Sequence, residues 1–173
     1  MFANPLKILK TIPLRENDIV ADLGAGTGHY SVIAGMLAPK GKIYAVEIEK
    51  DFLDTIKGKV KDPRIENVEV IWGNVEKPGG TKIGDGIVDV AIASNILFLV
   101  DDKEKFIDEI RRILKPNGKV LLVDWDSSII EGARAVKTVP QAKALAMFEK
   151  KNFFLDRIVD AGNHHYGMIL IKK

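Results

Sequence analysis

The stretch Val20–Ala21–Asp22–Leu23–Gly24–Ala25–Gly26–Thr27–Gly28 decides the fold class of this chain. Its first residues read as a short buried strand that runs directly into a glycine-rich turn, and a helix is expected to begin near His29. Three glycines at every second position let the backbone pass within contact distance of a ligand, because none carries a Cβ atom. The stretch therefore predicts a strand–turn–helix unit with a ligand at the turn. A tight turn that binds nothing is the alternative.

The spacing of the glycines and the position of Asp22 indicate the kind of ligand. A turn that holds the pyrophosphate of a dinucleotide has the spacing G-x-G-x-x-G and leads into a helix N-terminus. In this chain position 29 is His, and Asp22 stands at the end of the strand just before the turn. A carboxylate there repels a pyrophosphate but suits a cationic or amine-bearing ligand. These residues favour S-adenosylmethionine (SAM) over a nicotinamide dinucleotide.

The same stretch resembles motif I of the class I SAM-dependent methyltransferases. The resemblance implies that the aspartate and the glycines lie against the methionine part of SAM. His29 and Tyr30 follow the turn, and we expect them to cover the methionine end. His29 is equally compatible with an ordinary position in the first turn of the helix. The cofactor-binding residues expected in this part of the chain are Asp22, Gly24, Ala25, Gly26, Gly28 and Tyr30.

Strand-like and helix-like segments alternate along the rest of the chain, which predicts an α/β fold with a parallel sheet. The short segment 161–165, which contains Gly162–Asn163, separates the last two expected strands, so a hairpin must join them. The resemblance implies a Rossmann-like, mostly parallel sheet of seven strands in the order 3-2-1-4-5-7-6, with the last strand antiparallel and helices on both faces. The expected strands are 19–23, 42–48, 68–72, 88–93, 119–125, 153–160 and 166–172, and the expected helices are 4–11, 30–37, 51–61, 103–114 and 141–151.

Length and composition favour one soluble domain. The chain has 173 residues, 46% of them hydrophobic, so we expect residues 1–173 to form a single domain. No apolar run approaches the length of a membrane span and no signal peptide is evident, so a cytoplasmic location is expected. The absence of cysteine excludes disulfides, zinc–thiolate sites and cysteine nucleophiles, and we expect no metal. The net charge of +2 is too small to indicate nucleic-acid binding.

The ends of the second and third strands are expected to hold the nucleoside part of SAM. A carboxylate at a strand end can accept hydrogen bonds from both ribose hydroxyls, and the family resemblance gives that role to Glu47, with Ile48 against the adenine. Glu49 takes the role if the register differs by one pleat, and an exposed strand end without a ligand is the alternative. Where the family usually has Gly-Asp, this chain has Gly73–Asn74–Val75. The Asn74 amide can still accept from the adenine amino group, although the segment also suits a simple turn.

Ser94–Asn95–Ile96–Leu97 follows the fourth strand at the position of motif IV, and Ser94 is expected at the cofactor site. Methyltransferases that act on amino groups of nucleobases or glutamine carry an (Asp/Asn/Ser)-Pro-Pro-aromatic clamp there. This stretch has no proline, so methylation of an exocyclic amine by that clamp is not expected. Phe98–Leu99 stands where some small-molecule relatives carry histidines.

The segment from Asp89 to Trp125 resembles the type-11 branch, whose members methylate quinone precursors and other small molecules. We predict catalytic roles for Asp124, at the end of the fifth strand, and for His165, on the last strand, with Trp125 beside them. In the alternative interpretation Asp124 caps a loop, Trp125 packs on it and His165 points outward from an edge strand.

The sequence thus predicts a SAM-dependent methyltransferase that transfers a methyl group by in-line displacement to an unidentified, small-molecule acceptor. Two other functions remain open. One is an RNA or protein methyltransferase of the same fold. The other is a non-catalytic SAM-binding module. The sequence indicates neither the acceptor nor the oligomeric state, and it offers no support for a membrane partner.

Overall fold

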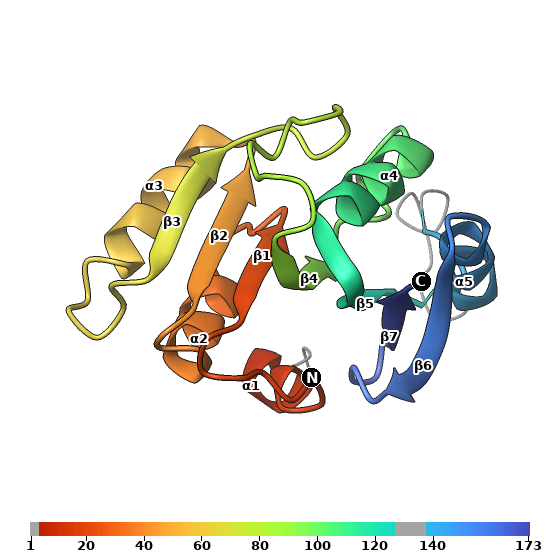
Figure 1. Ribbon diagram of the computed structural model, residues 1–173, viewed down its shortest axis with the longest axis horizontal. Coiled ribbons are helices and arrows are strands. Elements are labelled where there is room, and N and C mark those ends of the chain that lie inside the picture. Colours follow the sequence, from red (N-terminus) through yellow and green to blue (C-terminus); the bar gives the residue numbers. More distant parts are fainter. Residues whose placement is uncertain (1–3, 127–137) are drawn as a thin grey trace.

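The buried run before the glycine turn becomes the central strand of the sheet. The computed structural model describes residues 4–126 and 138–173, and in it β1 (Ile19–Leu23) pairs in parallel with β2 (Lys42–Glu47) on one side and β4 (Val88–Ser94) on the other (Figure 1). β3 (Val68–Trp72) forms one edge, and the order is β3-β2-β1-β4-β5-β7-β6. The predicted fold class and strand order are confirmed.

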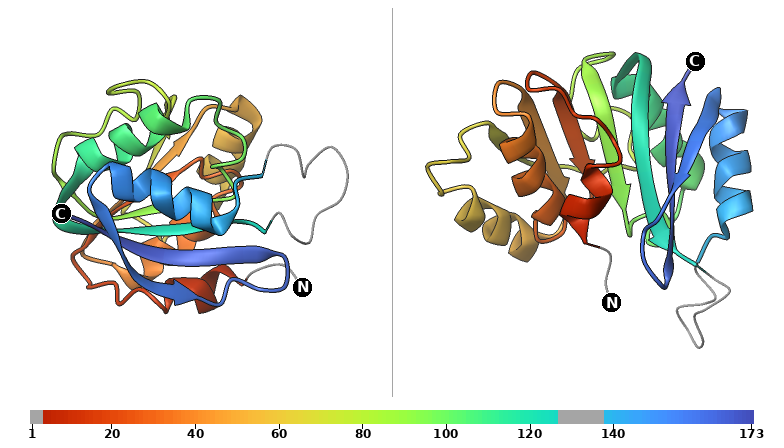
Figure 2. Two further views of the ribbon diagram at one scale, coloured as in Figure 1. Left: turned by 90° about the vertical axis from the view of Figure 1, so that its right-hand side faces the viewer. Right: turned by 90° about the horizontal axis from the view of Figure 1, so that it is seen from below.

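The helices form two layers, one on each face of the sheet (Figure 2). Side chains alternate across β1: Val20 contributes to the core cluster beneath α1 and α2, whereas Ala21 and Leu23 contribute to the cluster beneath α4 and α5. This alternation follows from the two-residue period of a strand. The helices are α1 (Pro5–Leu9), α2 (His29–Leu37), α3 (Lys50–Lys59), α4 (Lys103–Ile113) and α5 (Gln141–Lys150).

Local sequence signals set the helix starts. The Asn4 side chain accepts hydrogen bonds from the N–H groups of Leu6 and Lys7 at the start of α1, and the Asp102 side chain accepts from Lys105 N–H at the start of α4. Such caps satisfy N–H groups that the helix itself leaves without partners. Within α4, the apolar positions form one buried stripe against the sheet, made of Phe106, Ile107, Ile110 and Ile113.

β5 (Leu114–Trp125) begins five residues earlier than predicted. Leu114 already pairs with Val88, and the next pairs follow at Lys119, so residues 115–118 form a bulge between two paired stretches. Pro116 has no N–H group for the ladder, and Asn117 has φ +61°, which explains the break. The turn that the sequence predicted here is therefore a bulge inside a longer strand.

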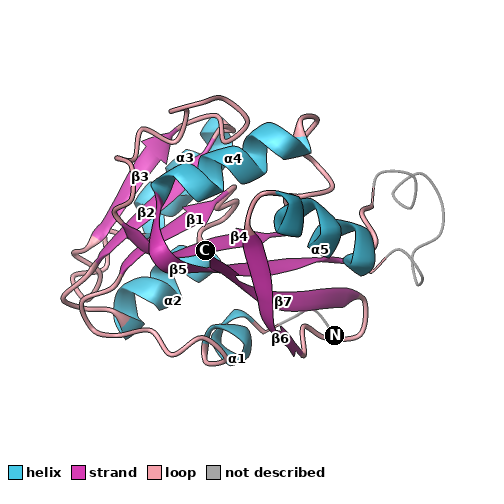
Figure 3. Cartoon of the chain, turned by 45° about the vertical axis from the view of Figure 1, so that its right-hand side comes forward, coloured by secondary structure: helices cyan, strands magenta, loops and turns pink. Residues whose placement is uncertain are grey.

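The C-terminal part adds a hairpin, as predicted. β6 (Phe153–Val159) and β7 (His165–Lys172) are antiparallel, and β7 also pairs antiparallel with β5 (Figure 3). Gly162, with φ +93°, lies in the connection between them. Within the ranges that the structure describes, no helix is long and apolar enough to cross a bilayer.

One buried carboxylate holds the long connection between β3 and β4 against α4. Glu109 is 2% exposed and accepts hydrogen bonds from the N–H groups of Gly79 and Thr81 and from the Thr81 hydroxyl. Arg112 pairs with the same carboxylate. Burial alone would raise the pKa of Glu109, but the hydrogen bonds from Arg112, Thr81 and Gly79 lower it to about 2. This connection follows Asn74 directly, so the contact fixes one wall of the site described next.

Candidate cofactor and acceptor site

A cavity of about 610 Å³ opens at the carboxyl ends of β1 to β4. It lies where the strand order reverses between β1 and β4, which is where open α/β sheets bind ligands. Its volume is in the range of about 300–1,000 Å³ that is usual for small-molecule sites. The predicted site residues that line it are Asp22, Gly24, Ala25, Gly26, Tyr30, Glu47, Ile48, Gly73, Asn74, Val75, Ser94 and His165. Gly28 and Asp124 lie outside this lining.

Glycine is required at the three positions of the turn for different structural reasons. All adopt positive φ, +69° at Gly24, +53° at Gly26 and +77° at Gly28. A Cβ at Gly24 would lie 2.1 Å from Cδ1 of Ile96, and a Cβ at Gly28 would lie 2.9 Å from Cγ1 of Ile56 on α3. A Cβ at Gly26 would meet no heavy atom within 4 Å. The first and last glycines thus serve packing, and Gly26 alone leaves open space beside the cavity.

Glu47 joins the glycine turn to the end of β2. Its side chain is nearly buried, and one oxygen accepts from Gly26 N–H at 2.8 Å. The other oxygen accepts from the N–H groups of Ile48 at 2.7 Å and Glu49 at 3.0 Å. Since each carboxylate oxygen has two lone pairs, Glu47 retains the capacity to accept from a ligand. Glu49, the second choice from the sequence, also lines the cavity.

A second carboxylate, that of Asp22 at the end of β1, also belongs to a residue of the cavity lining. It is buried and accepts a hydrogen bond of 2.6 Å from the Ser31 hydroxyl. Burial raises the pKa of Asp22 to about 6, the hydrogen bonds from Ser31 oppose this rise, and the charge of Glu47 adds to it. Two carboxylates that interact electrostatically therefore line the same cavity, and a bound cation would stabilise the charged form of both.

The wall at the end of β3 is shaped by a tight turn. The Asn74 side-chain oxygen accepts from Glu76 N–H at 2.9 Å, as in the turn that the sequence left open as an alternative. A Cβ at Gly73 would lie 2.5 Å from the carbonyl oxygen of Gly80, so glycine permits the close approach of that loop. Ile48 and Phe52 add apolar surface on the neighbouring wall and are 48% and 41% exposed.

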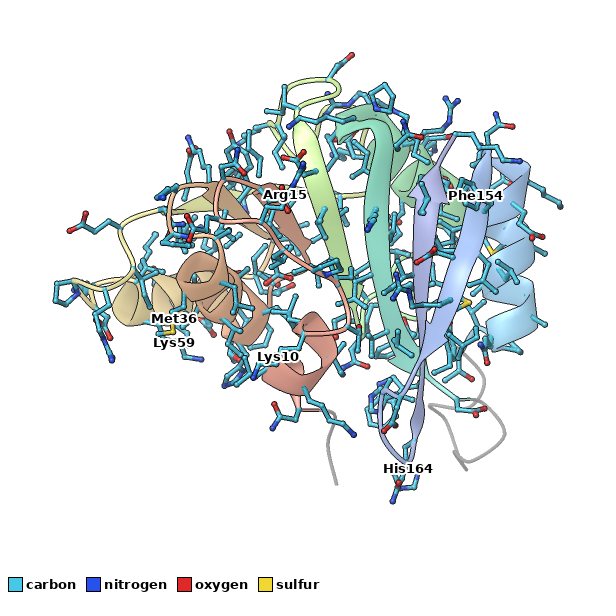
Figure 4. The ribbon with its side chains drawn as sticks, turned by 60° about the horizontal axis from the view of Figure 1, so that its bottom comes forward. Lys10, Arg15, Met36, Lys59, Phe154 and His164 are labelled. Atoms are coloured by element: carbon cyan, nitrogen blue, oxygen red, sulfur yellow. The ribbon has the colours of Figure 1, made fainter. Side chains whose placement is uncertain are left out.

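The end of β4 and the start of β7 form the other end of the cavity. Burial raises the pKa of Tyr30, and a hydrogen bond between its side chain and Ser94 opposes this rise. Asn95 has φ +55° and donates its N–H to the carbonyl of Val123 at 2.8 Å. The ring of His165 packs on Trp125, with centroids 4.2 Å apart. The preceding residue, His164, points away from the sheet at the end opposite Arg15 (Figure 4).

Asp124 takes part in loop architecture instead of the cavity wall. It is 1% exposed and accepts hydrogen bonds from Leu97 N–H at 2.8 Å and Trp125 N–H at 2.7 Å. Burial raises its pKa to about 6 in spite of these backbone donors. The carboxylate thus caps the segment after β4, as in the alternative interpretation of the sequence, whereas His165 lines the cavity.

Sequence reasoning did not select several residues of the lining. The omitted residues include Asn95 and Glu76, and the apolar residues Pro5, Phe52, Leu99 and Val100. Asn95 directly follows Ser94 at the end of a strand, which is the signal that would have selected it. Phe52 and Leu99 carry no such signal, because a large apolar residue in a helix or turn is equally typical of a core.

Comparison with known proteins agrees with this geometry. Residues 14–169 match a protein family described as a methyltransferase domain. The chain is 29% identical over 164 residues to the ubiquinone/menaquinone biosynthesis C-methyltransferase UbiE of Francisella tularensis subsp. novicida, which covers 92% of this chain and 62% of that protein. It is 28% identical over 108 residues to an arsenite methyltransferase of Halobacterium salinarum, which covers 62% of this chain and 27% of that protein.

The chain therefore spans less than two thirds of the length of these curated relatives. Among solved structures, it is similar to a SAM-dependent methyltransferase from Aquifex aeolicus with a TM-score of 0.89 and 24% identity, covering 99% of this chain and 91% of that one. This likeness shows the fold. The family match extends over most of the sequence and includes the glycine turn and every strand of the cavity, and on that basis the chain belongs to the methyltransferase domain family.

Proposed function

We propose that this chain is a SAM-dependent methyltransferase that acts on a small molecule in the cavity at the ends of β1 to β4. One observation carries the proposal. The described lining combines the glycine turn with four carboxylates, Asp22, Glu47, Glu49 and Glu76, and includes no lysine or arginine. SAM carries a positively charged sulfonium and no phosphate, so this lining attracts it and repels a dinucleotide.

The residues present fit the cofactor. The turn leaves open space at Gly26, and in the proposal the methionine part lies against Asp22 and the turn. Glu47, already held by three N–H groups, accepts from the ribose hydroxyls. Ile48 contacts the adenine, and Asn74 with Val75 binds its polar edge.

When bound, SAM supplies an electrophilic methyl group on a positively charged sulfur. The chain's own part is to bind an acceptor in line with that methyl group and to exclude water, and such orientation contributes several kcal/mol. His165 is the proposed catalytic residue. Burial lowers its pKa, and the neighbouring His164 lowers it further, so its ring is neutral near pH 7 and can accept a proton. Asp124 acts as a positioning residue through its hydrogen bond to Leu97 N–H.

Isothermal titration calorimetry with SAM and with S-adenosylhomocysteine tests the cofactor assignment. We expect dissociation constants at micromolar concentration for the unmodified protein and no measurable binding for Glu47→Ala or Gly26→Val. Glu149→Ala, which changes an exposed residue of α5, is the matched control and should bind normally. Failure of both ligands to bind the unmodified protein would overturn the proposal.

A non-catalytic SAM-binding module is the second candidate, and the position of Asp124 favours it. The carboxylate predicted as a base lies outside the described cavity lining and accepts hydrogen bonds from backbone N–H groups, so His165 is the remaining predicted base on that lining. Transfer of radioactive methyl from labelled SAM to any small molecule of a cell extract distinguishes the two. Transfer establishes an enzyme, and its absence in the presence of normal SAM binding favours the module.

We also propose that the protein is cytoplasmic and that residues 1–173 form one domain, as the composition predicts.

A small-molecule acceptor is favoured over RNA because four carboxylates line the cavity, and they would repel phosphates. RNA methylation would instead show as retention on an RNA column at low salt that is lost steeply as salt increases.

A further inference from the structure

Two buried polar atoms at one end of the cavity have no hydrogen-bond partner among the described residues. They are Oδ1 of Asn95, at the end of β4, and Nε2 of His165, at the start of β7. Both residues line the same cavity. A buried polar atom without a partner costs about 1–3 kcal/mol, and each such atom in a native protein calls for an explanation. One explanation is a bound molecule that supplies the missing hydrogen-bond partners.

The backbone holds Asn95 in a defined place. Its φ of +55° is a left-handed conformation that asparagine tolerates better than most residues. Its N–H donates to Val123 of β5, and the next residue, Ile96, packs against Gly24 of the glycine turn. The backbone of Asn95 is therefore fixed, and the residue lies on the same cavity lining as the turn where the methyl donor is proposed to bind.

His165 is held just as firmly. It pairs with Trp125 in the ladder between β5 and β7, and its ring stacks on the Trp125 ring. The ring is uncharged for the reason given above, and in the tautomer that carries its proton on Nδ1 the Nε2 atom accepts a hydrogen bond. Both orphaned atoms can thus be satisfied by a molecule that donates.

The charge of the cavity restricts this molecule further. The same lining includes the apolar residues Leu99, Val100 and Pro5. The described lining contains four carboxylates, those of Asp22, Glu47, Glu49 and Glu76, and no lysine or arginine. An anionic molecule would enter against their repulsion and would find no cationic side chain to pair with it there.

We infer that Asn95 and His165 bind the methyl acceptor, and that this acceptor is a small, uncharged molecule that donates hydrogen bonds through a hydroxyl or N–H group. The inference rests on the proposed function, because it places the acceptor beside a bound SAM. It makes Asn95 a specificity-determining residue. It also excludes carboxylates, phosphates and nucleotides as acceptors at this site.

Four matched probes test the inference on protein saturated with S-adenosylhomocysteine: phenol, aniline, anisole and benzoate. They share one ring and differ in whether they donate a hydrogen bond and whether they are charged. Saturation-transfer NMR followed by titration measures their binding. We expect phenol and aniline to bind at least tenfold more tightly than anisole or benzoate.

The variant Asn95→Gly removes the amide and keeps a residue that adopts positive φ without strain. We expect it to weaken phenol binding about tenfold, to the level of anisole, and to leave the affinity for S-adenosylhomocysteine within twofold of the original. Asn152→Gly is the matched control, because Asn152 has φ +60° and lies outside the cavity lining. It should change neither affinity.

Three results would overturn the inference: benzoate binding as tightly as phenol, phenol binding unaffected by Asn95→Gly, or no binding by any of the four probes. The affinity for S-adenosylhomocysteine is measured first on the same samples. Its absence means that the proposed function has failed, whereas normal cofactor binding with any of the three results means that only the acceptor assignment is wrong.

Discussion

Gly24→Ala tests whether the first glycine of the turn is required for packing. Gly24 has φ +69°, and an added Cβ would lie 2.1 Å from Cδ1 of Ile96. The left-handed backbone costs about 1 kcal/mol for alanine relative to glycine. Overlap with Ile96 forces this side chain to move and costs about 1–3 kcal/mol more. We therefore expect the free energy of unfolding to fall by about 2–4 kcal/mol.

Ile96→Val separates these two contributions because it removes only Cδ1. The next nearest atom to the added Cβ is Cγ1, at 3.1 Å. Alone, Ile96→Val should cost about 0.5–1.5 kcal/mol. In the double variant the 2.1 Å overlap is removed and only the contact of 3.1 Å with Cγ1 remains, so the combined loss should be smaller than the sum of the single losses by about 1–2 kcal/mol.

Urea unfolding of the four proteins at one pH measures the cycle. Gly86→Ala is the control for backbone strain, since Gly86 has φ +61° and an added Cβ would meet nothing within 4 Å; it should cost about 1 kcal/mol. Strictly additive losses in the cycle, or a Gly24→Ala loss no larger than that of Gly86→Ala, would refute the packing argument.

Three further substitutions give separate tests. Gly26→Ala should lower the free energy of unfolding by only about 1 kcal/mol, yet weaken S-adenosylhomocysteine binding at least tenfold in calorimetry, because the methyl group occupies open cavity space; normal binding contradicts this. Glu109→Gln should destabilise the protein by about 2–3 kcal/mol near pH 7, because Arg112 loses its buried charged partner and keeps only the exposed Asp85 among the described residues. The lowered pKa of Glu109, about 2, means that this contribution is present above its ordinary pKa and disappears as pH falls toward 2, so urea unfolding should show equal stabilities only in strong acid. Asp22 has a raised pKa of about 6, so ionisation costs stability as pH rises from about 4 to 6; Asp22→Asn should gain up to about 3 kcal/mol relative to the original between pH 4 and pH 7, and a pH-independent difference would contradict it.

The strands followed from local patterns that tertiary structure did not override, whereas their order was expected from the family resemblance. The run before Gly24 is apolar apart from Asp22, and its side chains face both helix layers, so a buried parallel strand was the only suitable element. Strand ends then predicted the cavity, because parallel strands bring Asp22, Glu47, Gly73 and Ser94 to one edge of the sheet. Predicting the position of the cavity therefore requires only the strand order and direction.

The roles of individual side chains were less accessible. Asp124 stands at a strand end as expected, but its oxygen is engaged by Leu97, 27 positions earlier in the chain. Such a long-range backbone partner leaves no local signature. The same applies to Asn95, which has a left-handed φ, an orphaned side-chain oxygen and an N–H group that donates to Val123 of β5. The bulge at Pro116 was expected as a turn, since the sequence does not reveal that Leu114 already pairs with Val88.

The three N–H groups around Glu47 have a kinetic consequence. They come from the glycine turn and from the segment after β2, so the two loops that border the cofactor site are tied together before any ligand arrives. The entropy of ordering these loops is lost when the protein folds, and association then needs little rearrangement. Cofactor capture should therefore follow a single exponential whose rate rises linearly with ligand concentration in stopped-flow experiments, without a plateau from a slow closing step.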